Sequence, residues 1–210
     1  MIVKPMEIEK RSFEIIQEEL RASGITVEKE KLPIVTRVIH TTADFDYAKN
    51  LVFSEGAIAT AKEALRSGCD IVTDTQMVRS GINKKTMALF GGEIHCFMSD
   101  EDVAREAKER EITRAQVSME KSAKLRKPCI YAIGNAPTAL VALKNLVESG
   151  QISPALIIGV PVGFVNVVES KEMIMELPVP YIVARGRKGG SNVAACICNA
   201  LMYELDRVVG

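Results

Sequence analysis

Beyond the first fifty residues, short apolar segments alternate with longer segments whose apolar residues recur every three or four positions. The short segments are typical of buried strands, and the longer ones of amphipathic helices. The predicted strands are Cys69–Thr73, Glu93–Met98, Cys129–Ile133, Ala155–Val160 and Tyr181–Ala184. The predicted helices are Ala57–Leu65, two pieces ending at Leu89, Asp100–Arg110, Arg114–Leu125, Pro137–Glu148, Asn166–Glu176 and Ser191–Leu205. This alternation predicts an α/β fold: a mainly parallel sheet of five or slightly more strands, with helices on both faces.

Two further helices are predicted before this alternation begins. Met6–Ala22 has helical apolar spacing and stops near Gly24, and a second helix opens at Pro33. We expect these helices to pack on the edge of the sheet or on a partner, and Ser54 to cap the helix at Ala57. With no internal repeat or low-complexity linker, residues 1–210 are predicted to form a single domain with an N-terminal helical arm over about residues 1–50.

The helix that opens at Pro33 carries the first candidate for chemistry. At about 100° per residue, the apolar side chains from 34 to 39 form one stripe, and Thr36, Arg37 and His40 lie opposite. His40 therefore points away from its helix's own core contact. Histidine exchanges a proton near neutral pH, so His40 is a candidate acid or base. The alternative is an ordinary surface histidine.

Composition and charge exclude several classes of protein. The 210 residues include 27 basic and 27 acidic side chains, and this balance argues against non-specific nucleic-acid binding. The longest apolar stretch, Ala155–Val168, is interrupted and too short to cross a membrane, and no secretory signal is visible. The five cysteines contain no C-x-x-C pair. We therefore expect a reduced, cytoplasmic protein without a structural metal.

Three polar, glycine-containing loops directly follow predicted strands, at residues 134–138, 159–164 and 186–192. In a parallel sheet such loops meet at the carboxyl edge, where ligands bind, and each opens a helix N-terminus that favours anions. Arg185, Arg187 and Lys188 add positive charge to the last loop. Together the loops predict a site for a ligand with several anionic groups. Any one of these loops, taken alone, is better explained as a tight turn between a strand and a helix.

Familiar catalytic signatures are missing from the sequence. It contains no G-x-x-x-x-G-K-[ST] loop, no G-x-G-x-x-G after a first strand and no G-x-S-x-G elbow. These absences argue against a P-loop, a dinucleotide fold and a hydrolase triad. His95 lies inside a predicted strand without a partner motif, and we interpret it as structural.

Several blocks of the sequence resemble the precorrin-8X methylmutases, which include the cobalt-precorrin-8 methylmutases. The longest is RVIHTTADFD at residues 37–46, and the resemblance begins at Ile8–Phe13 and runs along essentially the whole chain. The other blocks are Thr73–Thr75, Ser80–Lys84, Gly134–Leu140, Gly159–Val165, Glu169–Lys171 and Gly186–Asn192.

The resemblance implies an isomerase that moves a methyl group from C-11 to C-12 of a contracted tetrapyrrole. The product would be hydrogenobyrinate, or cobyrinate when the substrate contains cobalt. No external cofactor is implied, because the substrate supplies both methyl donor and acceptor. Members of the family are homodimers with shared active sites. The family's motif histidine matches His40, which is expected to donate a proton to the macrocycle.

The substrate is a mostly apolar ring with acetate and propionate arms, so we expect its site to hold basic and hydrogen-bonding groups. Arg114, Arg187 and Lys188 are expected to pair with carboxylates. Ser12 matches a family position that contacts the macrocycle. The remaining predicted substrate-binding residues are Arg37, Thr41, Asn135, Gly163, Gly189, Gly190 and Ser191. Asp44 and Asp46 are left without a role in binding or catalysis.

Two other functions remain open from the sequence. A non-catalytic carrier would bind the tetrapyrrole without changing it. An α/β enzyme for phosphorylated metabolites would use residues 186–192 as its phosphate loop. Both leave the block around His40 unexplained. No residue discriminates between metal-free and cobalt-containing substrate, since the macrocycle would carry the ion.

Overall fold

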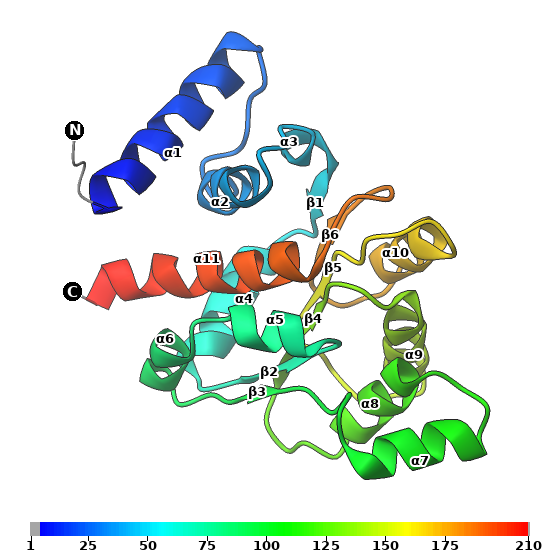
Figure 1. Ribbon diagram of the computed structural model, residues 1–210. Coiled ribbons are helices and arrows are strands. Elements are labelled where there is room, and N and C mark those ends of the chain that lie inside the picture. Colours follow the sequence, from blue (N-terminus) through cyan, green and yellow to red (C-terminus); the bar gives the residue numbers. More distant parts are fainter. Residues whose placement is uncertain (1–4, 210) are drawn as a thin grey trace.

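The computed structural model describes residues 5–209, and its centre is a six-stranded sheet in the order β1-β6-β5-β4-β2-β3 (Figure 1). Strands β2 to β6 are parallel, and β1 pairs with β6 in the antiparallel sense. The strands are β1 Leu51–Phe53, β2 Asp70–Thr73, β3 Ile94–His95, β4 Cys129–Ile133, β5 Leu156–Gly159 and β6 Tyr181–Ala184. The predicted fold class, a mainly parallel sheet covered on both faces, is confirmed.

Eleven helices surround this sheet in the described part of the chain. They are α1 Pro5–Ala22, α2 Leu32–Thr42, α3 Tyr47–Asn50, α4 Ala57–Arg66, α5 Gln76–Gly81, α6 Lys84–Leu89, α7 Glu101–Glu109, α8 Arg114–Ser122, α9 Pro137–Glu148, α10 Val167–Met175 and α11 Ser191–Val209. Strand β4 is buried along its whole length. Its side chains alternate between two apolar cores, with Ile130 and Ala132 in one, and Tyr131 and Ile133 in the other. Burial on both faces explains why the strands are continuous apolar segments in the sequence.

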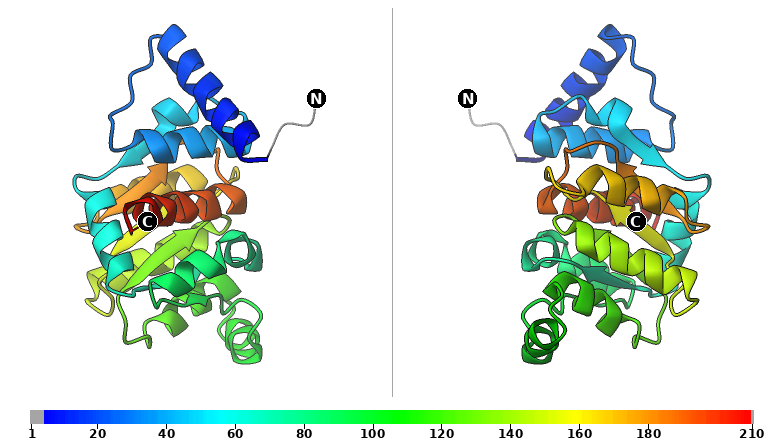
Figure 2. Two further views of the ribbon diagram at one scale, coloured as in Figure 1. Left: turned by 90° about the vertical axis from the view of Figure 1, so that its left-hand side faces the viewer. Right: turned by 90° about the vertical axis from the view of Figure 1, so that its right-hand side faces the viewer.

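The first core lies under α11, which packs against α2, α4 and α5, whereas α8, α9 and α10 cover the opposite face. Helix α1 packs on α2, outside the sheet layers. Figure 2 shows α1 at one end of the molecule and α7 at the other. The apolar stripe of α2 faces α11, so the segment that carries His40 is joined to the helix that follows the last strand.

Three local predictions were wrong, and two short elements were missed. Strand β1 and helix α3 were missed because three or four residues are too few to show a period, and β1 becomes a strand by pairing with β6. Strand β3 has two residues rather than the six of Glu93–Met98. Gly56 takes the N-cap position of α4, whereas the Ser54 hydroxyl accepts the Tyr181 N–H. Thr36 was expected opposite the core, but it is buried.

The order β3-β2-β4-β5-β6 places a change of direction between β2 and β4, where ligands commonly bind in open parallel sheets. Here the carboxylate of Asp74, which follows β2, lies at this point. It accepts the N–H groups of Gly134, Asn135 and Ala136 over 2.9, 2.8 and 2.7 Å. Burial raises the pKa of Asp74, and these N–H donors oppose that shift. The N–H groups of residues 134–136, in the loop before α9, therefore already hold an anion from the protein and are not free for the arms of a ligand.

Replacing Asp74 with asparagine should destabilise the protein. The amide has the same shape but faces one of the three N–H groups with a donor, so a buried charge-assisted hydrogen bond is lost. We expect a decrease of about 2–3 kcal/mol in the free energy of unfolding, measured with urea. Asp102→Asn is the matched control; Asp102 forms an exposed ion pair with Lys121, so its substitution should move the urea midpoint far less. Equal effects of both variants would contradict this role of Asp74.

Candidate functional site

Three loops that leave neighbouring parallel strands pack against one another at the carboxyl end of the sheet. A Cβ atom added to Gly134 would lie 2.7 Å from Ser191 Cα, and one added to Gly189 would lie 2.1 Å from the Val160 carbonyl oxygen. Backbone meets backbone at both positions, which leaves no room for a side chain. The Gly190 N–H also donates to the Val160 carbonyl over 2.9 Å. The loops predicted to share one edge of the sheet therefore form one packed unit.

Lys188 is bound within the protein. Its Nζ lies 2.6 Å from Asp44 Oδ2 and 2.7 Å from Asp46 Oδ2. These contacts raise the pKa of Lys188 and lower that of Asp44. The two aspartates that had no predicted role thus connect the segment after α2 to the loop before α11.

Arg187 and Arg114 keep their charges available. Both are exposed, and neither forms an ion pair with a residue in the described part of the chain. The Arg187 guanidinium lies 5.4 Å from the centre of the Phe164 ring, and the ring is 81% exposed. Arg114 opens α8, which is joined to the start of α9 by the Thr113–Thr138 hydroxyl contact. Asn135, on the loop before α9, is also exposed.

His40 lies in the last turn of α2 and is exposed, as the helical spacing predicted. Its ring packs against the Phe13 ring in a T-shaped arrangement, with 5.3 Å between the ring centres and an interplanar angle of 81°. Phe13 belongs to α1, so the first helix covers one side of the imidazole. The residues of the apolar stripe of α2 are each at most 2% exposed, which fixes the direction in which His40 points.

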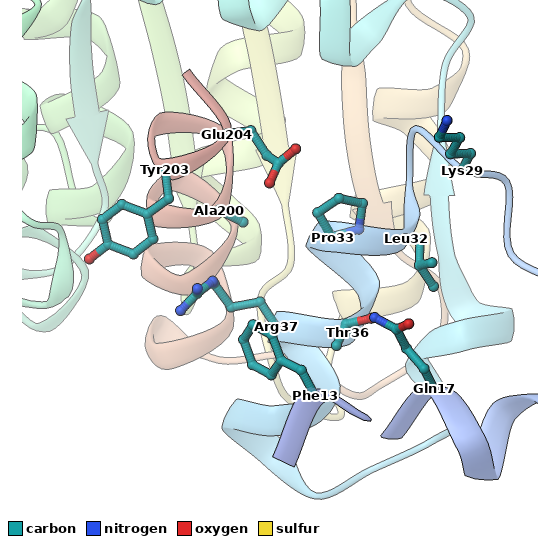
Figure 3. A pocket seen from close by; sticks show the side chains of 10 residues that line it. All are labelled: Phe13, Gln17, Lys29, Leu32, Pro33, Thr36, Arg37, Ala200, Tyr203 and Glu204. Atoms are coloured by element: carbon teal, nitrogen blue, oxygen red, sulfur yellow. The ribbon is translucent and has the colours of Figure 1, made fainter. Parts of the chain in front are cut away.

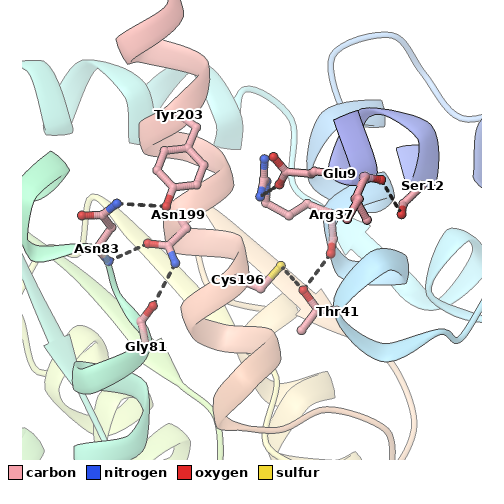
Figure 4. A network of polar contacts seen from close by, with 10 residues as sticks. Glu9, Ser12, Arg37, Thr41, Gly81, Asn83, Cys196, Asn199 and Tyr203 are labelled. Atoms are coloured by element: carbon pink, nitrogen blue, oxygen red, sulfur yellow. Dashed lines mark hydrogen bonds and ion pairs between the residues drawn. The ribbon is translucent and has the colours of Figure 1, made fainter. Parts of the chain in front are cut away.

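Arg37 lies between two aromatic rings. Its guanidinium carbon is 5.1 Å from the centre of the Phe13 ring and 4.9 Å from that of Tyr203, and its Nη1 is 2.9 Å from Glu9 Oε1. The Thr41 hydroxyl donates to the Arg37 carbonyl over 2.9 Å (Figure 4). Arg37 therefore ties α1, α2 and α11 together.

Two hollows open beside Arg37 and Tyr203. The first has a volume of about 340 Å³ and lies between α1, α2 and α11 (Figure 3). The second has a volume of about 270 Å³ and is lined by Thr41 on α2 and by Asn192 and Cys196 on α11. Because Arg37 and Tyr203 line both, the hollows adjoin. They reach from the helix of His40 to the end of the glycine loop before α11.

The structure brings some predicted site residues together and holds others in internal contacts. Ser12, Arg37 and Thr41 gather where α1, α2 and α11 meet, and the Ser12 hydroxyl donates to the carbonyl of Ile8 (Figure 4). The Ser191 hydroxyl lies 2.9 Å from that of Thr75. The other loop residues in this unit are Gly163, Arg187, Lys188, Gly189 and Gly190.

His95 forms internal contacts. Its Nε2 is 3.1 Å from Asp70 Oδ2, and its ring stacks on Phe97. These contacts agree with its structural interpretation. Within the part of the chain that the structure describes, no group of three or more His, Cys, Asp or Glu side chains is arranged to hold a metal ion.

Comparison with known proteins shows the family of this chain. The family model for precorrin-8X methylmutase matches residues 7–204. The chain belongs to the precorrin-8X methylmutase family. A cobalt-precorrin-8 methylmutase of Priestia megaterium is 47% identical over 206 residues, which cover 98% of this chain and 91% of that protein. One from Salmonella typhimurium is 45% identical, and the match covers 97% of each chain.

A solved structure of the precorrin-8X methylmutase family is also similar. The precorrin-8x methyl mutase from Thermus thermophilus superposes with a TM-score of 0.86 at 36% identity, over 96% of this chain and 98% of that one. The likeness therefore covers nearly all of the chain. No helix in residues 5–209 is long and apolar enough to cross a membrane.

Sequence reasoning overlooked Lys171, although its block is one of those that resemble the methylmutase family. Its side chain is fully buried on α10, and its Nζ donates to the carbonyls of Gly186 and Lys188 over 2.7 and 2.9 Å. Burial lowers the pKa of this amine to about 8. An amphipathic helix pattern gives no signal for such a residue, because lysines are usually exposed.

The shifted pKa of Lys171 predicts a pH-dependent stability. Between pH 8 and the ordinary pKa of 10.5, the unfolded chain keeps a proton that the folded chain has released, so stability rises with pH. Lys171→Met carries no such proton. Wild type should gain up to about 3 kcal/mol relative to this variant across that range, measured by urea unfolding at each pH. A difference that stays constant with pH would contradict the shift.

Proposed function

We propose that this chain catalyses the methyl migration from C-11 to C-12 that converts precorrin-8X to hydrogenobyrinate, or cobalt-precorrin-8 to cobyrinate. The observation that carries the proposal is the position of His40. This exposed histidine lies in the last turn of α2, and the turn that follows α2 is joined to the basic glycine loop through Lys188. Family membership supplies the reaction class.

The polar groups around the site match such a substrate. The macrocycle is a broad apolar ring whose edge carries many carboxylates. Arg187 and Arg114 are exposed cations with no carboxylate partner in the described residues, and either can bind a carboxylate by charge-assisted hydrogen bonds. Phe164 beside Arg187 offers an apolar surface for the ring. Ser12, Thr41, Asn135 and Ser191 add neutral hydrogen-bonding groups.

In the proposed mechanism the protein contributes a proton and a rigid fit. His40 donates a proton to the macrocycle near ring C, the bond from the methyl group to C-11 breaks, and a bond to C-12 forms. Substrate and product are isomers, so the macrocycle must release one proton for the one that it receives. Since both ends of the migration lie in one bound molecule, orientation replaces any need for a methyl donor. The reaction therefore asks for one well-placed acid.

We further infer that the natural substrate contains cobalt and that the enzyme works as a cytoplasmic homodimer. The relatives named above at 45–47% identity are cobalt-precorrin-8 methylmutases. The five cysteines are all buried and free, as a reducing compartment allows. Ile8 and Ile15, seven residues apart on α1, are 54% and 40% exposed, and a second copy would cover them. A shared active site would then include residues of both copies near α1.

Replacing His40 with alanine should abolish turnover without unfolding the protein, because the ring is exposed. The test is a single-turnover reaction with cobalt-precorrin-8 and with precorrin-8X, followed by the visible spectrum of the macrocycle. Wild type should convert the cobalt form faster, and His40→Ala should bind it but leave its spectrum unconverted. His95→Gln, a change at the other histidine, should retain turnover. Near-normal conversion by His40→Ala would rule out His40 as the proton donor. Binding without conversion by wild type would indicate a carrier.

Replacing Arg187 with alanine should weaken substrate binding about tenfold or more, as expected for loss of one charge-assisted contact. The dissociation constant can be measured by titrating the protein with the reaction product and recording either the quenching of protein fluorescence or the change in absorbance. Arg66→Ala removes an exposed arginine from α4, far along the chain from the loops, and should not alter the constant. Unchanged affinity in Arg187→Ala would remove this residue from the site.

A further inference from the structure

Lys171 is a buried cation that forms no ion pair with a carboxylate in the described part of the chain. Its side chain is fully buried, and its Nζ donates hydrogen bonds to two backbone carbonyls. Burying an ammonium group costs free energy unless hydrogen bonds compensate it. Both compensating carbonyls, those of Gly186 and Lys188, belong to the basic loop before α11. The hydrogen bonds of the buried amine thus stabilise the conformation of this one loop.

The backbone of this loop is held at three consecutive carbonyls. Lys171 Nζ binds those of Gly186 and Lys188, and the carbonyl of Arg187 between them accepts the Gly163 N–H over 3.2 Å. Gly186 has a φ of +78°, a left-handed conformation that suits glycine. The backbone at Arg187 is therefore fixed from α10 and from the loop after β5.

The side chain of Lys188 continues this connection toward His40. Its Nζ bridges Asp44 and Asp46, which follow His40 by four and six residues. Asp44 Oδ1 in turn accepts the Asp46 N–H over 3.0 Å, and Ala43 closes α2 with a φ of +53°. The turn after His40 is thereby tied to the loop that carries Arg187.

We propose that Lys171 and Lys188 act in series as positioning residues: Lys171 fixes the basic loop, and Lys188 carries that fixed position to the turn that ends the helix of His40. The pair sets the separation between the carboxylate anchor, Arg187, and the proton donor, His40. This inference rests on the proposed function. It also changes the expectation for Lys188, which acts on Asp44 and Asp46 rather than as a substrate ligand.

The central test separates positioning from substrate contact by the kinetics of Lys188→Met. Loss of positioning should lower kcat at least tenfold while KM stays within twofold, since Lys171 still holds Arg187. The double variant Asp44→Asn/Asp46→Asn should reproduce this effect, because it releases Lys188 without removing it. Lys144→Met removes a lysine that pairs with Glu148 within α9; it is the control and should match wild type. If Lys188 binds substrate, Lys188→Met would instead raise KM, and the double aspartate variant would lower it; that result overturns the proposal.

The series arrangement is tested with Lys171→Met and the double variant Lys171→Met/Lys188→Met. Lys171→Met should lower kcat/KM at least tenfold, because both the anchor and the acid lose their position. The loss of kcat in the double variant should be clearly smaller than the product of the two single losses. If the loss of kcat in the double variant equals the product of the two single losses, the lysines act independently, and the proposal that they act in series is overturned. Lys171→Gln, which retains a donor, should recover part of the activity, and it serves as the test variant if the methionine variant does not fold.

Amide hydrogen exchange in the full chain gives a readout that does not depend on turnover. Lys171→Met or Lys171→Gln should speed exchange both in residues 185–190 and in residues 43–46, whereas Lys188→Met should speed only the second segment. Exchange in residues 43–46 that is insensitive to both lysines would overturn the proposal. If the exchange pattern holds but wild type does not convert either tetrapyrrole, the proposed function fails and the structural connection stands.

Discussion

Close backbone packing between the loop before α11 and the loops after β4 and β5 is the constraint on which the rest of the site depends. Gly134 and Gly189 have no room for a Cβ atom, so each of these positions requires the smallest residue. With the loops in contact, the start of α11, the basic side chains and the end of the sheet form one rigid unit. Asp74 completes that unit by holding the N–H groups of the first loop.

The N-terminal helices add the acid to this unit. Helix α2 buries its apolar stripe against the core and leaves His40 exposed on the other side, with Phe13 of α1 against the ring. Arg37 between Phe13 and Tyr203 joins α1 to α11, and Lys188 joins the turn after α2 to the basic loop. The two hollows adjoin at Arg37: one is lined by the start of α2, and the other by Thr41 and the start of α11. The helix that carries His40 and the loop that carries Arg187 are thus held in place by separate contacts within the same fold.

The sequence predicted the layers of the fold and the direction of His40, because both follow from periodicity. Most strands and helices begin and end within a few residues of their predicted limits, and β4, β6 and α9 have the predicted limits. Strand β1 could not be predicted, since it exists only through pairing with β6. Thr36 could not be predicted as buried, because its burial depends on tertiary packing around α2 rather than on the spacing within that helix. Contacts between distant residues, such as those of Lys171 and Asp74, leave no periodic signal.

Among the predicted site residues, too, the sequence indicated position but not long-range contacts. The sequence showed which cations lie on glycine loops. It did not show which of these cations form ion pairs with carboxylates of the protein itself. Lys188 is paired with Asp44 and Asp46, whereas Arg187 is free of ion pairs among the described residues. The most direct test of the account is a crystal structure of the complex with the corrin product. The account predicts the ring beside His40, with a carboxylate arm on Arg187 and Lys188 still bound to the aspartates. A ring bound away from His40, or Lys188 released to a carboxylate arm, would contradict it.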